Sequence, residues 1–282
     1  MAREIELTKI HGCANDYLFA NCLDHSLDDA GALAREVSDR RRGIGSDGLI
    51  LVCPSSRADF RMEMYNADGS RGEMCGNGIR GFGKYVADRG LADGDRVAVE
   101  TDAGVKTLEL FRNGGNRVDR VTVDMGAPVL EGREIPVDAD GPVIDQSLEV
   151  AGRSWNVTCV SMGNPHCVSF VVDPDALDLA TIGPQFVGHP FFPRGVNAEF
   201  VRGDSRSHLT MRVWERGSGE TWACGTGACA VVVAAALTGR ADRQVTVSLP
   251  GGDLEIDYRD DERVLMTGPA VEVFTTTIEV AQ

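Results

Sequence analysis

Two cysteines stand out for their chemistry because each occupies the same short motif. Cys75 lies in Met-Cys-Gly-Asn-Gly and Cys224 lies in Ala-Cys-Gly-Thr-Gly, and each motif leads directly into an apolar, helix-length stretch, residues 79–87 and 228–237. The start of a helix presents unpaired N–H groups and the positive end of the helix dipole, which favour anions. A cysteine in that position can have its pKa lowered. The motifs therefore predict two reactive thiols, each beside a place for a carboxylate.

The two motifs belong to a longer internal repeat. Their cysteines are 149 positions apart, and the same separation joins two further pairs, Asn15 with Asn164 and Asn66 with Glu215. Related halves commonly pack about a pseudo-twofold axis. We therefore expect the two thiols to face each other across one cleft.

Two opposed thiols suit the inversion of a carbon next to a carboxylate. One thiolate removes the α-proton while the opposite thiol returns a proton to the other face, and the helix starts stabilise the charge that grows on the carboxylate. The structural alternative is that Cys75 and Cys224 are small buried caps, because cysteine is among the most buried residue types. The occurrence of Cys-Gly-x-Gly at two equivalent positions favours the chemical interpretation.

The rest of the chain predicts the elements that must position these thiols. A length of 282 residues predicts about two domains, and 43% hydrophobic residues are enough for two cores. Alternating runs at residues 60–64, 97–101, 121–123 and 209–214 are typical of half-buried strands. Apart from the stretches after the cysteines, only residues 28–38 are expected to be helical. We predict an α+β fold of two pseudo-symmetric domains, each a mostly antiparallel curled sheet or barrel around a central helix.

The predicted boundary between the halves lies in a turn-rich stretch, residues 124–128. Residues 1–125 are assigned to the first half and residues 126–270 to the second. The last strand, near residues 271–282, is expected to return to the first half.

Composition excludes several classes of partner. A formal net charge of −15 repels phosphate backbones, so nucleic acid is not expected. No stretch approaches the roughly 20 apolar residues that span a bilayer, and the start of the chain lacks the apolar core of a signal peptide. We therefore expect a cytoplasmic protein that does not bind membranes.

The remaining cysteines and the histidines give no metal signal. No Cys-x-x-Cys pair occurs, and the five histidines fall at no ligand spacing, so no metal site is expected. Six cysteines are predicted to be packing residues: Cys13, Cys22, Cys53, Cys159, Cys167 and Cys229.

The first cysteine loop also contains two misleading matches to nucleotide-binding motifs. Residues 76–81 fit the dinucleotide pattern G-x-G-x-x-G, but a polar loop at residues 66–73 separates them from the preceding strand. A P-loop match fails because Tyr85 occupies the place of the magnesium-binding Ser or Thr. No nucleotide cofactor is expected.

A set of motifs in one order gives the chain a family resemblance. They are His11-Gly-Cys-Ala-Asn-Asp, Gly43-Ile-Gly-Ser-Asp-Gly, Tyr65-Asn-Ala-Asp-Gly-Ser, Met74-Cys-Gly-Asn-Gly-Ile-Arg, Gly163-Asn-Pro-His-Cys, Gly195-Val-Asn, Trp214-Glu-Arg-Gly and Ala223-Cys-Gly-Thr-Gly. From near its start to near its end, the chain resembles the diaminopimelate epimerase family. One departure is Gly48, where some relatives carry Gln.

The resemblance implies a reaction and a set of site residues. The reaction is the interconversion of LL-2,6-diaminopimelate and its meso isomer, on the route to lysine and peptidoglycan, without pyridoxal phosphate or a metal. The resemblance makes Cys75 and Cys224 the two acid/base thiols. Four residues are expected to hold the carboxylate at the reacting carbon: Gly76, Asn77, Gly225 and Thr226. The amino groups and the remote carboxylate are assigned to Asn15, Asn66, Asn164, Asn197, Glu215 and Arg216.

Two residues are expected to tune the thiols, His166 and Glu215. The expected partners are the small-molecule substrate and, in a homodimer, a second copy of the chain. Two alternatives stay open at this point: a racemase of another amino acid such as histidine, on the same fold, and an inactive module that binds an amino acid. Arg216 argues against the first because it would lack a remote carboxylate to bind, and the two retained thiols argue against the second.

Overall fold

The computed structural model describes residues 3–280, and of Arg3 and Val280 it describes only the backbone. Residues 1–2 of the predicted first half and residues 281–282 of the predicted last strand lie outside the described residues. Contacts divide the chain into two compact units. Unit 1 contains the residues up to Val123 together with those from Gly268 onwards, and unit 2 is Asp124–Thr267. The proposed division into domains at 125/126 and 270/271 stays a prediction.

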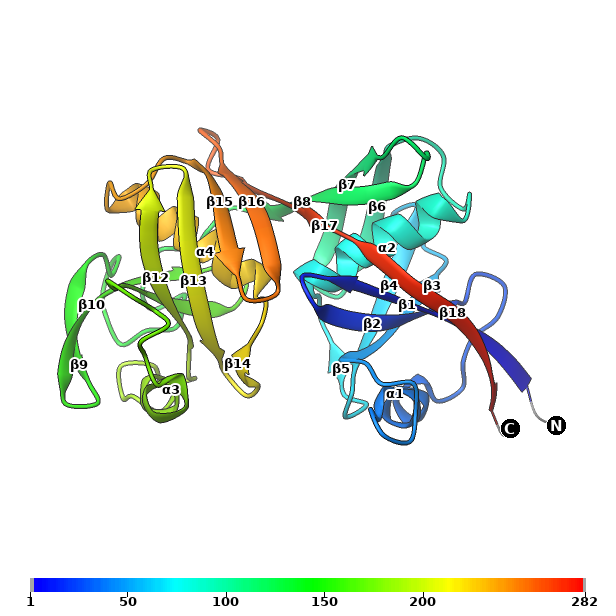
Figure 1. Ribbon diagram of the computed structural model, residues 1–282, viewed down its shortest axis with the longest axis horizontal. Helices are drawn as coiled ribbons and strands as arrows, with labels where there is room; N and C mark the ends of the chain where they lie inside the picture. The colour runs from blue at the N-terminus through cyan, green and yellow to red at the C-terminus, as the bar shows by residue number, and fades with distance from the viewer. Residues whose placement is uncertain (1–2, 281–282) are drawn as a thin grey trace. The chain divides into compact units, whose positions relative to one another are not determined.

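Unit 1 is a curled sheet with two helices. Its helices are α1 (Ala30–Ser38) and α2 (Gly76–Asp88). Its strands are β1 (Arg3–Gly12), β2 (Asn15–Asn21), β3 (Gly48–Cys53), β4 (Phe60–Asn66), β5 (Arg71–Gly72), β6 (Arg96–Thr101), β7 (Gly104–Arg112), β8 (Val118–Gly126) and β18 (Val271–Val280). The last strand pairs with β1 in antiparallel register (Figure 1).

Unit 2 has the same composition of elements. Its helices are α3 (Leu179–Val187) and α4 (Gly225–Leu237). Its strands are β9 (Gln146–Val150), β10 (Arg153–Ser161), β11 (Pro165–Phe170), β12 (Asn197–Ser205), β13 (His208–Glu215), β14 (Gly219–Thr221), β15 (Gln244–Leu249), β16 (Gly252–Tyr258) and β17 (Val264–Pro269).

The repeat in the sequence is also a repeat in structure. The bounds of α1 and α3, and those of α2 and α4, differ by the same 149 positions that separate the two cysteines. The strand register repeats as well, because Tyr17 pairs with Gly48 in the parallel β2–β3 pair and His166 pairs with Asn197 in the parallel β11–β12 pair. One backbone plan is therefore built twice, once in each unit.

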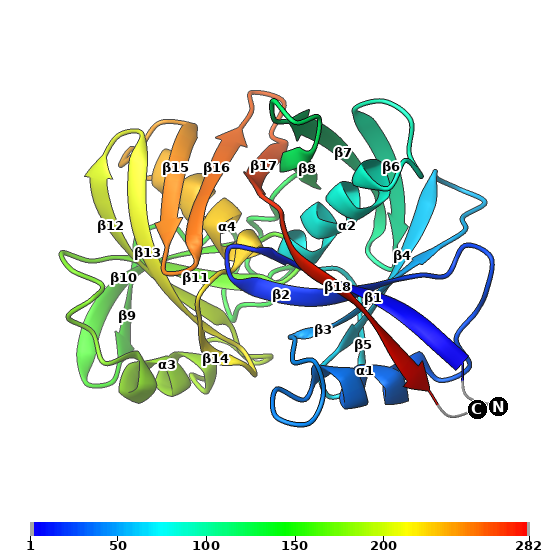
Figure 2. The same cartoon turned by 45° about the vertical axis from the view of Figure 1, so that its right-hand side comes forward.

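Each sheet packs one helix on each face. In unit 1, Leu49 and Leu51 of β3 join the core beneath α1, whereas Phe19 of β2 points the other way and stacks on Tyr85 of α2. In unit 2, Phe200 of β12 packs against Phe186 of α3, and α4 lies on the opposite face. Figure 2 shows both central helices, each enclosed by the strands of its own unit. This alternation follows from the two-residue period of a strand.

The central helices differ in composition although both are buried. Helix α4 is apolar around nearly its whole circumference and is buried from Gly225 to Ala235, apart from Thr226, as expected for a helix inside a core. Helix α2 is equally buried but carries Arg80 and Lys84 inward. The charges of α2 have no counterparts in α4.

The predicted fold class is confirmed, including the mostly antiparallel sheets and the central helix of each half. The strands expected at residues 60–64, 97–101, 121–123 and 209–214 are present, and so is the helix expected within residues 28–38. The six cysteines predicted to pack are buried except for Cys53, which is half-buried. Among the helices of residues 3–280, none is both long and apolar enough to cross a membrane.

The prediction of helices was wrong in one place, because α3 was not expected. Pro184 and Gly183 lie inside it and disfavour a helix on propensity alone. Asp178 nevertheless caps its first turn by accepting a hydrogen bond from the Thr181 N–H, just as Asp29, 149 positions earlier, caps α1. Tertiary packing of Phe186 then retains the helix.

Candidate active site

Cys75 occupies the N-cap of α2 and has a dense hydrogen-bond environment. Its Sγ accepts from the Gly78 N–H at 3.4 Å and donates to Asn15 Oδ1 at 3.3 Å. The same Oδ1 accepts from Asn77 Nδ2 at 3.2 Å, and Asn15 Nδ2 donates to Asp47 at 2.6 Å. Asn15, Asn77 and the thiol therefore form one network at the helix start.

A strained turn holds Asn15 in this network. The hairpin between β1 and β2 has two central residues, Cys13 and Ala14, with φ of 51° and 65°. Both angles lie in the left-handed region that a two-residue hairpin turn of this type demands, and alanine adopts it only at an energetic cost. The turn directs the following Asn15 at Cys75.

Arg80 of α2 fixes the orientation of the Asn77 side chain by a hydrogen bond. It is fully buried and lies one turn along α2. Its guanidinium donates to Asn77 Oδ1 at 2.8 Å, to the Gly76 carbonyl at 3.1 Å and to the Pro269 carbonyl at 3.3 Å. Because Asn77 Oδ1 accepts from Arg80, its Nδ2 is held facing Asn15. A buried positive charge thus stands behind the Cys75 loop.

Cys224 occupies the equivalent N-cap of α4, where it is 5% exposed. Its Sγ lies 3.6 Å from Thr226 Oγ1. The backbone at the two caps is nearly the same, with φ and ψ of −130° and 123° at Cys75 and −127° and 103° at Cys224. The sequence therefore places both thiols identically on their helices, and their surroundings make the difference.

A fully buried ionisable pair lies beside Cys224. His166 Nδ1 of β11 is 2.6 Å from Glu199 Oε1 of β12, and both side chains are 0% exposed. His166 Nε2 is 3.0 Å from Asn164 Oδ1. His166 and Glu199 lie on the sheet face that α4 covers, because their strand neighbours Cys167 and Ala198 belong to the core on the opposite face. The predicted residues Asn164 and His166 are thus brought together with Cys224.

The groups assigned to the remote end of the substrate lie at the ends of β4, β12 and β13. Asn197 Oδ1 accepts from the Arg216 N–H at 2.8 Å, and the exposed Arg216 side chain donates to the Arg194 carbonyl at 2.9 Å. Glu215 accepts from the Thr221 hydroxyl. Asn66 donates to Ser70 at 3.0 Å, at the end of β4. Hydrogen bonds within unit 2 therefore hold Asn197 and Arg216 in place.

The expectation that the helix starts lower the thiol pKa values is wrong, because burial raises both. Loss of water raises the pKa of Cys75, although hydrogen bonds from Tyr17 and the backbone and the charge of Arg80 act in the opposite direction. Burial raises the pKa of Cys224 well above its usual value, and the carboxylates of Glu215 and Glu199 raise it further. Desolvation outweighs the helix start in both cases.

Three potential metal ligands meet in unit 2, because one ligand atom each of His166, Glu199 and Cys224 lies within 4.8 Å of the others. These residue types suit Zn²⁺. However, His166 Nδ1 and Glu199 Oε1 are 2.6 Å apart, whereas two ligands of one tetrahedral ion with bonds of about 2.0 Å are separated by about 3.3 Å. A shared proton fits this contact better than a metal ion does.

The structure adds three residues that the sequence analysis missed: Tyr17, Arg80 and Glu199. Tyr17 lies on β2 and Glu199 on β12, two strands that the sequence analysis did not predict. A signal was present in the repeat, because Glu199 lies 149 positions after Ile50. A charge at a position that is apolar in the other copy marks a place where the two halves differ in chemistry. Whether Cys75 and Cys224 face each other stays a prediction.

The chain is similar to known proteins over most of its length. The family model "Diaminopimelate epimerase" matches residues 7–131 and 158–273. Diaminopimelate epimerase of Moorella thermoacetica is 54% identical over 273 residues, covering 96% of this chain and 98% of its own length. That of Acetivibrio thermocellus is 51% identical over 278 residues, covering 98% and 99%.

Solved structures share the fold at low sequence identity. A hydroxyproline epimerase from Agrobacterium vitis has a TM-score of 0.67 and 14% identity, covering 99% of this chain and 93% of that one. A phenazine biosynthesis protein of the PhzF family from Bacillus anthracis has a TM-score of 0.68 and 16% identity, covering 99% and 100%. With the family model and the two close relatives, these findings lead to one assignment: the chain belongs to the diaminopimelate epimerase family.

Proposed function

We propose that this protein is an isomerase that interconverts LL-2,6-diaminopimelate and meso-diaminopimelate by two-base proton transfer at the α-carbon. Cys75 and Cys224 are the two bases. The observation that carries the proposal is the repeated helix start, with a thiol at the N-cap of each central helix and the same strand register around it. Family membership supports the substrate.

The backbone at each helix start supplies the electrostatic part of the mechanism. Gly76 and Gly225 begin the helices, and Asn77 and Thr226 follow them. The N–H groups of a first helical turn lack intrahelical partners and can receive the substrate carboxylate. As the α-proton leaves, negative charge grows on that carboxylate, and fixed donors stabilise it without reorganisation.

The thiols move the proton. The thiolate of one cysteine takes the α-proton, forming an S–H bond as the C–H bond breaks, and the thiol of the other cysteine gives its proton to the opposite face of the resulting carbanion. At the end, the cysteine that began as the thiolate carries the proton, the other cysteine is the thiolate, and the configuration of the α-carbon is inverted. General acid–base catalysis typically raises a reaction rate by about 10²–10⁴-fold. Because one thiol removes the proton and the other supplies one, loss of either should lower the turnover rate by a factor of this order.

The polar residues outside this chemistry select the substrate. Arg216 can bind the remote carboxylate bidentately, and its backbone is held by Asn197. Asn15, Asn66 and Asn164 offer amide donors and acceptors for amino and carboxylate groups, and Glu215 can pair with an ammonium. A site built to bind polar groups rejects analogues lacking them by roughly 10⁴–10⁵-fold.

The test is incubation of the protein with a panel of amino acids in D2O, with α-proton loss followed by NMR. We expect exchange with LL- and meso-diaminopimelate, and exchange with lysine, which lacks the remote carboxylate, at least about a thousandfold slower. Turnover of lysine or histidine within about tenfold of diaminopimelate would favour a broader racemase. No exchange with any member would favour a binding module.

The setting of the reaction is part of the proposal. We place the protein in the cytoplasm, in the synthesis of lysine and peptidoglycan precursors. A homodimer is the proposed assembly, and sedimentation of the purified protein tests it.

A further inference from the structure

Glu199 is a buried ionisable residue that the proposed mechanism does not use. Its side chain is 0% exposed, and Oε1 contacts His166 Nδ1 at 2.6 Å. Its other oxygen, Oε2, is buried and makes no hydrogen bond within the described residues 3–280. Burying a carboxylate with incomplete hydrogen bonding is unfavourable. A residue of this kind at a packing position therefore needs a reason other than packing.

The repeat shows that packing does not need a carboxylate here. The counterpart of Glu199 in unit 1 is Ile50, and each lies against the third residue of the central helix. A Cβ added at Gly78 would lie 2.7 Å from Ile50 Cδ1, and a Cβ added at Gly227 would lie 2.9 Å from Glu199 Oε1. An aliphatic side chain fills the same space in the other unit.

The carboxylate is aimed at the start of α4. The same Cβ at Gly227 would lie 3.2 Å from Cys224 Sγ, so Gly227 leaves room for both groups beside it. A ligand atom of Glu199 and one of His166 lie within 4.8 Å of the Cys224 sulfur. Glu215 of β13 acts on the same sulfur electrostatically, and Thr226 and the Gly227 N–H contact it from α4.

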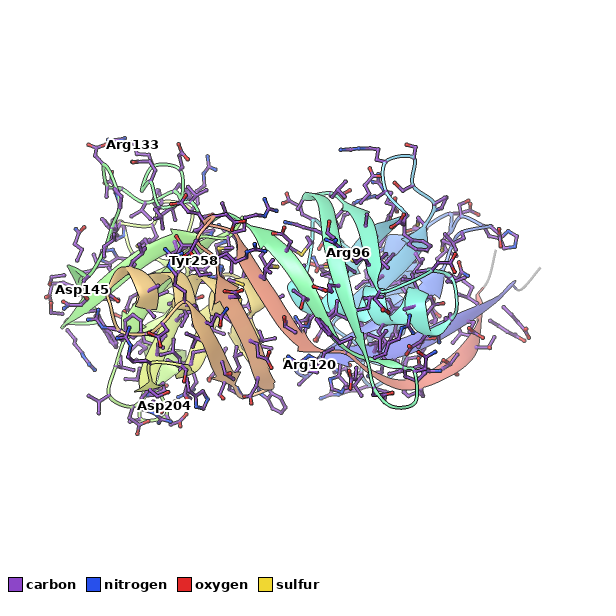
Figure 3. All side chains as sticks on the ribbon, turned by 90° about the horizontal axis from the view of Figure 1, so that it is seen from above. Arg96, Arg120, Arg133, Asp145, Asp204 and Tyr258 are labelled. Carbon is purple, nitrogen blue, oxygen red and sulfur yellow. The ribbon has the colours of Figure 1, made fainter. Side chains whose placement is uncertain are left out.

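Contacts on both ring nitrogens hold the pair in place. His166 Nε2 lies 3.0 Å from Asn164 Oδ1, and His166 Nδ1 lies 2.6 Å from Glu199 Oε1. Two other ion pairs of unit 2, Asp145 with Arg240 and Asp204 with Arg202, lie at the surface, and Figure 3 labels Asp145 and Asp204. The Glu199–His166 pair lies beside the thiol instead.

We propose that Glu199 is a positioning residue for Cys224: together with His166 it keeps the proton on the Cys224 thiol in the substrate-free protein. A negative group near a thiol favours the protonated form. Cys224 then begins the reaction as the proton donor, and Cys75 begins it as the base. This inference rests on the proposed function, because it assigns the starting proton to one of the two proposed thiols.

The test measures the proton affinity of each thiol separately. Full-length protein is alkylated with iodoacetamide across a pH series, and mass spectrometry of peptides gives one midpoint for Cys75 and one for Cys224. We expect Glu199→Gln to move the Cys224 midpoint toward acid by about one pH unit or more, while the Cys75 midpoint stays in place. The control Glu149→Gln removes an exposed carboxylate of β9 in the same unit and should move neither midpoint.

A second variant guards against a folding defect. Glu199→Asp keeps the charge but retracts it by one methylene, so its Cys224 midpoint should move in the same direction by less than half as much. In activity, Glu199→Gln should move the alkaline limb of the kcat/KM profile for diaminopimelate toward acid. A residue that only packs would lower the rate at every pH without moving that limb.

The outcomes separate this inference from the proposed function. An unmoved Cys224 midpoint in both folded variants, or a movement toward alkali, overturns the role of Glu199. If Cys224→Ala keeps wild-type turnover, the proposed two-thiol function is wrong instead. If Cys224→Ala is inactive and the Glu199 variants leave the midpoint unmoved, only the inference about Glu199 fails.

Discussion

The two helix starts share a backbone plan and differ in buried charge. In unit 1, the fully buried guanidinium of Arg80 lies one turn along the helix that Cys75 caps. In unit 2, Cys229 takes the position of Arg80, and the buried carboxylate of Glu199 lies beside Cys224. A cation therefore supports one thiol and an anion approaches the other.

This difference in buried charge shows how a duplicated fold can give two thiols unequal proton affinities. The backbone conformation at the two caps is similar, but the Gly78 N–H donates to Cys75 Sγ, whereas the Cys224 side chain makes no such cap hydrogen bond. Burial raises both pKa values, although Cys75 is only half-buried and Cys224 is buried. Side chains then act in opposite directions, because Tyr17 and Arg80 lower the pKa of Cys75, whereas Glu215 and Glu199 raise that of Cys224.

Removal of either thiol should abolish most turnover despite their unequal surroundings. Cys75→Ala and Cys224→Ala should each lower kcat by about a thousandfold, because each removes one partner of the proton transfer. Turnover is measured by α-proton exchange in D2O. Cys53→Ala, at a half-buried cysteine outside the site, is the control and should retain activity. A single site variant that keeps more than about a tenth of wild-type turnover would contradict the two-base mechanism.

The two units also differ in the residue proposed to bind the remote carboxylate. Arg216 of unit 2 has Ala67 as its counterpart in unit 1. Arg216→Met should lower kcat/KM for diaminopimelate by about a hundredfold, because the remote carboxylate loses charged hydrogen bonds. The value for lysine should change little, so the ratio of the two falls. Equal losses for both substrates would indicate that Arg216 supports the fold rather than the remote carboxylate.

Arg80 should matter for both stability and the proton affinity of Cys75. Arg80→Met leaves buried acceptors at Asn77 and two backbone carbonyls without their donor, so the free energy of unfolding should fall by about 2–3 kcal/mol. The Cys75 alkylation midpoint should move toward alkali, because a positive charge that favours the thiolate is lost. Urea titration and peptide mass spectrometry measure the two effects. A midpoint that stays in place would limit Arg80 to a structural role.

The equivalent glycines of the central helices should respond differently to alanine. Gly227→Ala brings a methyl group against Glu199 and Cys224, and we expect kcat/KM to fall about tenfold through misplacement of the thiol. Gly78→Ala meets the flexible end of Ile50, which can move aside, so its effect should be smaller. Steady-state kinetics of the two variants make the comparison. A larger loss from Gly78→Ala would show that the surroundings of Cys75 are the less tolerant.

The turns before the two site asparagines offer the smallest test. Ala14 and Gly163 occupy equivalent positions with φ of 65° and 98°, and only glycine adopts such angles freely. Ala14→Gly should raise the free energy of unfolding by about 0.5 kcal/mol, and Gly163→Ala should lower it by about 1 kcal/mol. Thermal melting checks both signs. If Ala14→Gly destabilises the protein, the strain assigned to the first turn is absent.

Much of the fold followed from local sequence signals. The helix starts at Cys75 and Cys224 were predicted because glycine-rich motifs preceded apolar stretches, and the strands were predicted from alternating residues. The offset of 149 positions would also have predicted α3 from α1, but Pro184 made the local signal weak. A repeat is therefore a stronger guide than propensity where the two disagree.

What the sequence determined by itself was the pair of thiols, their places at helix starts and the family of the chain. These features depend on residues that are adjacent in the chain, so short sequence motifs are enough to predict them. Only the tertiary structure placed the Arg80 guanidinium against the Pro269 carbonyl and Glu199 beside Cys224, because those contacts join residues that are distant in sequence. The proton affinities of the thiols depend on such contacts and on the loss of water, and both exist only once the chain has folded.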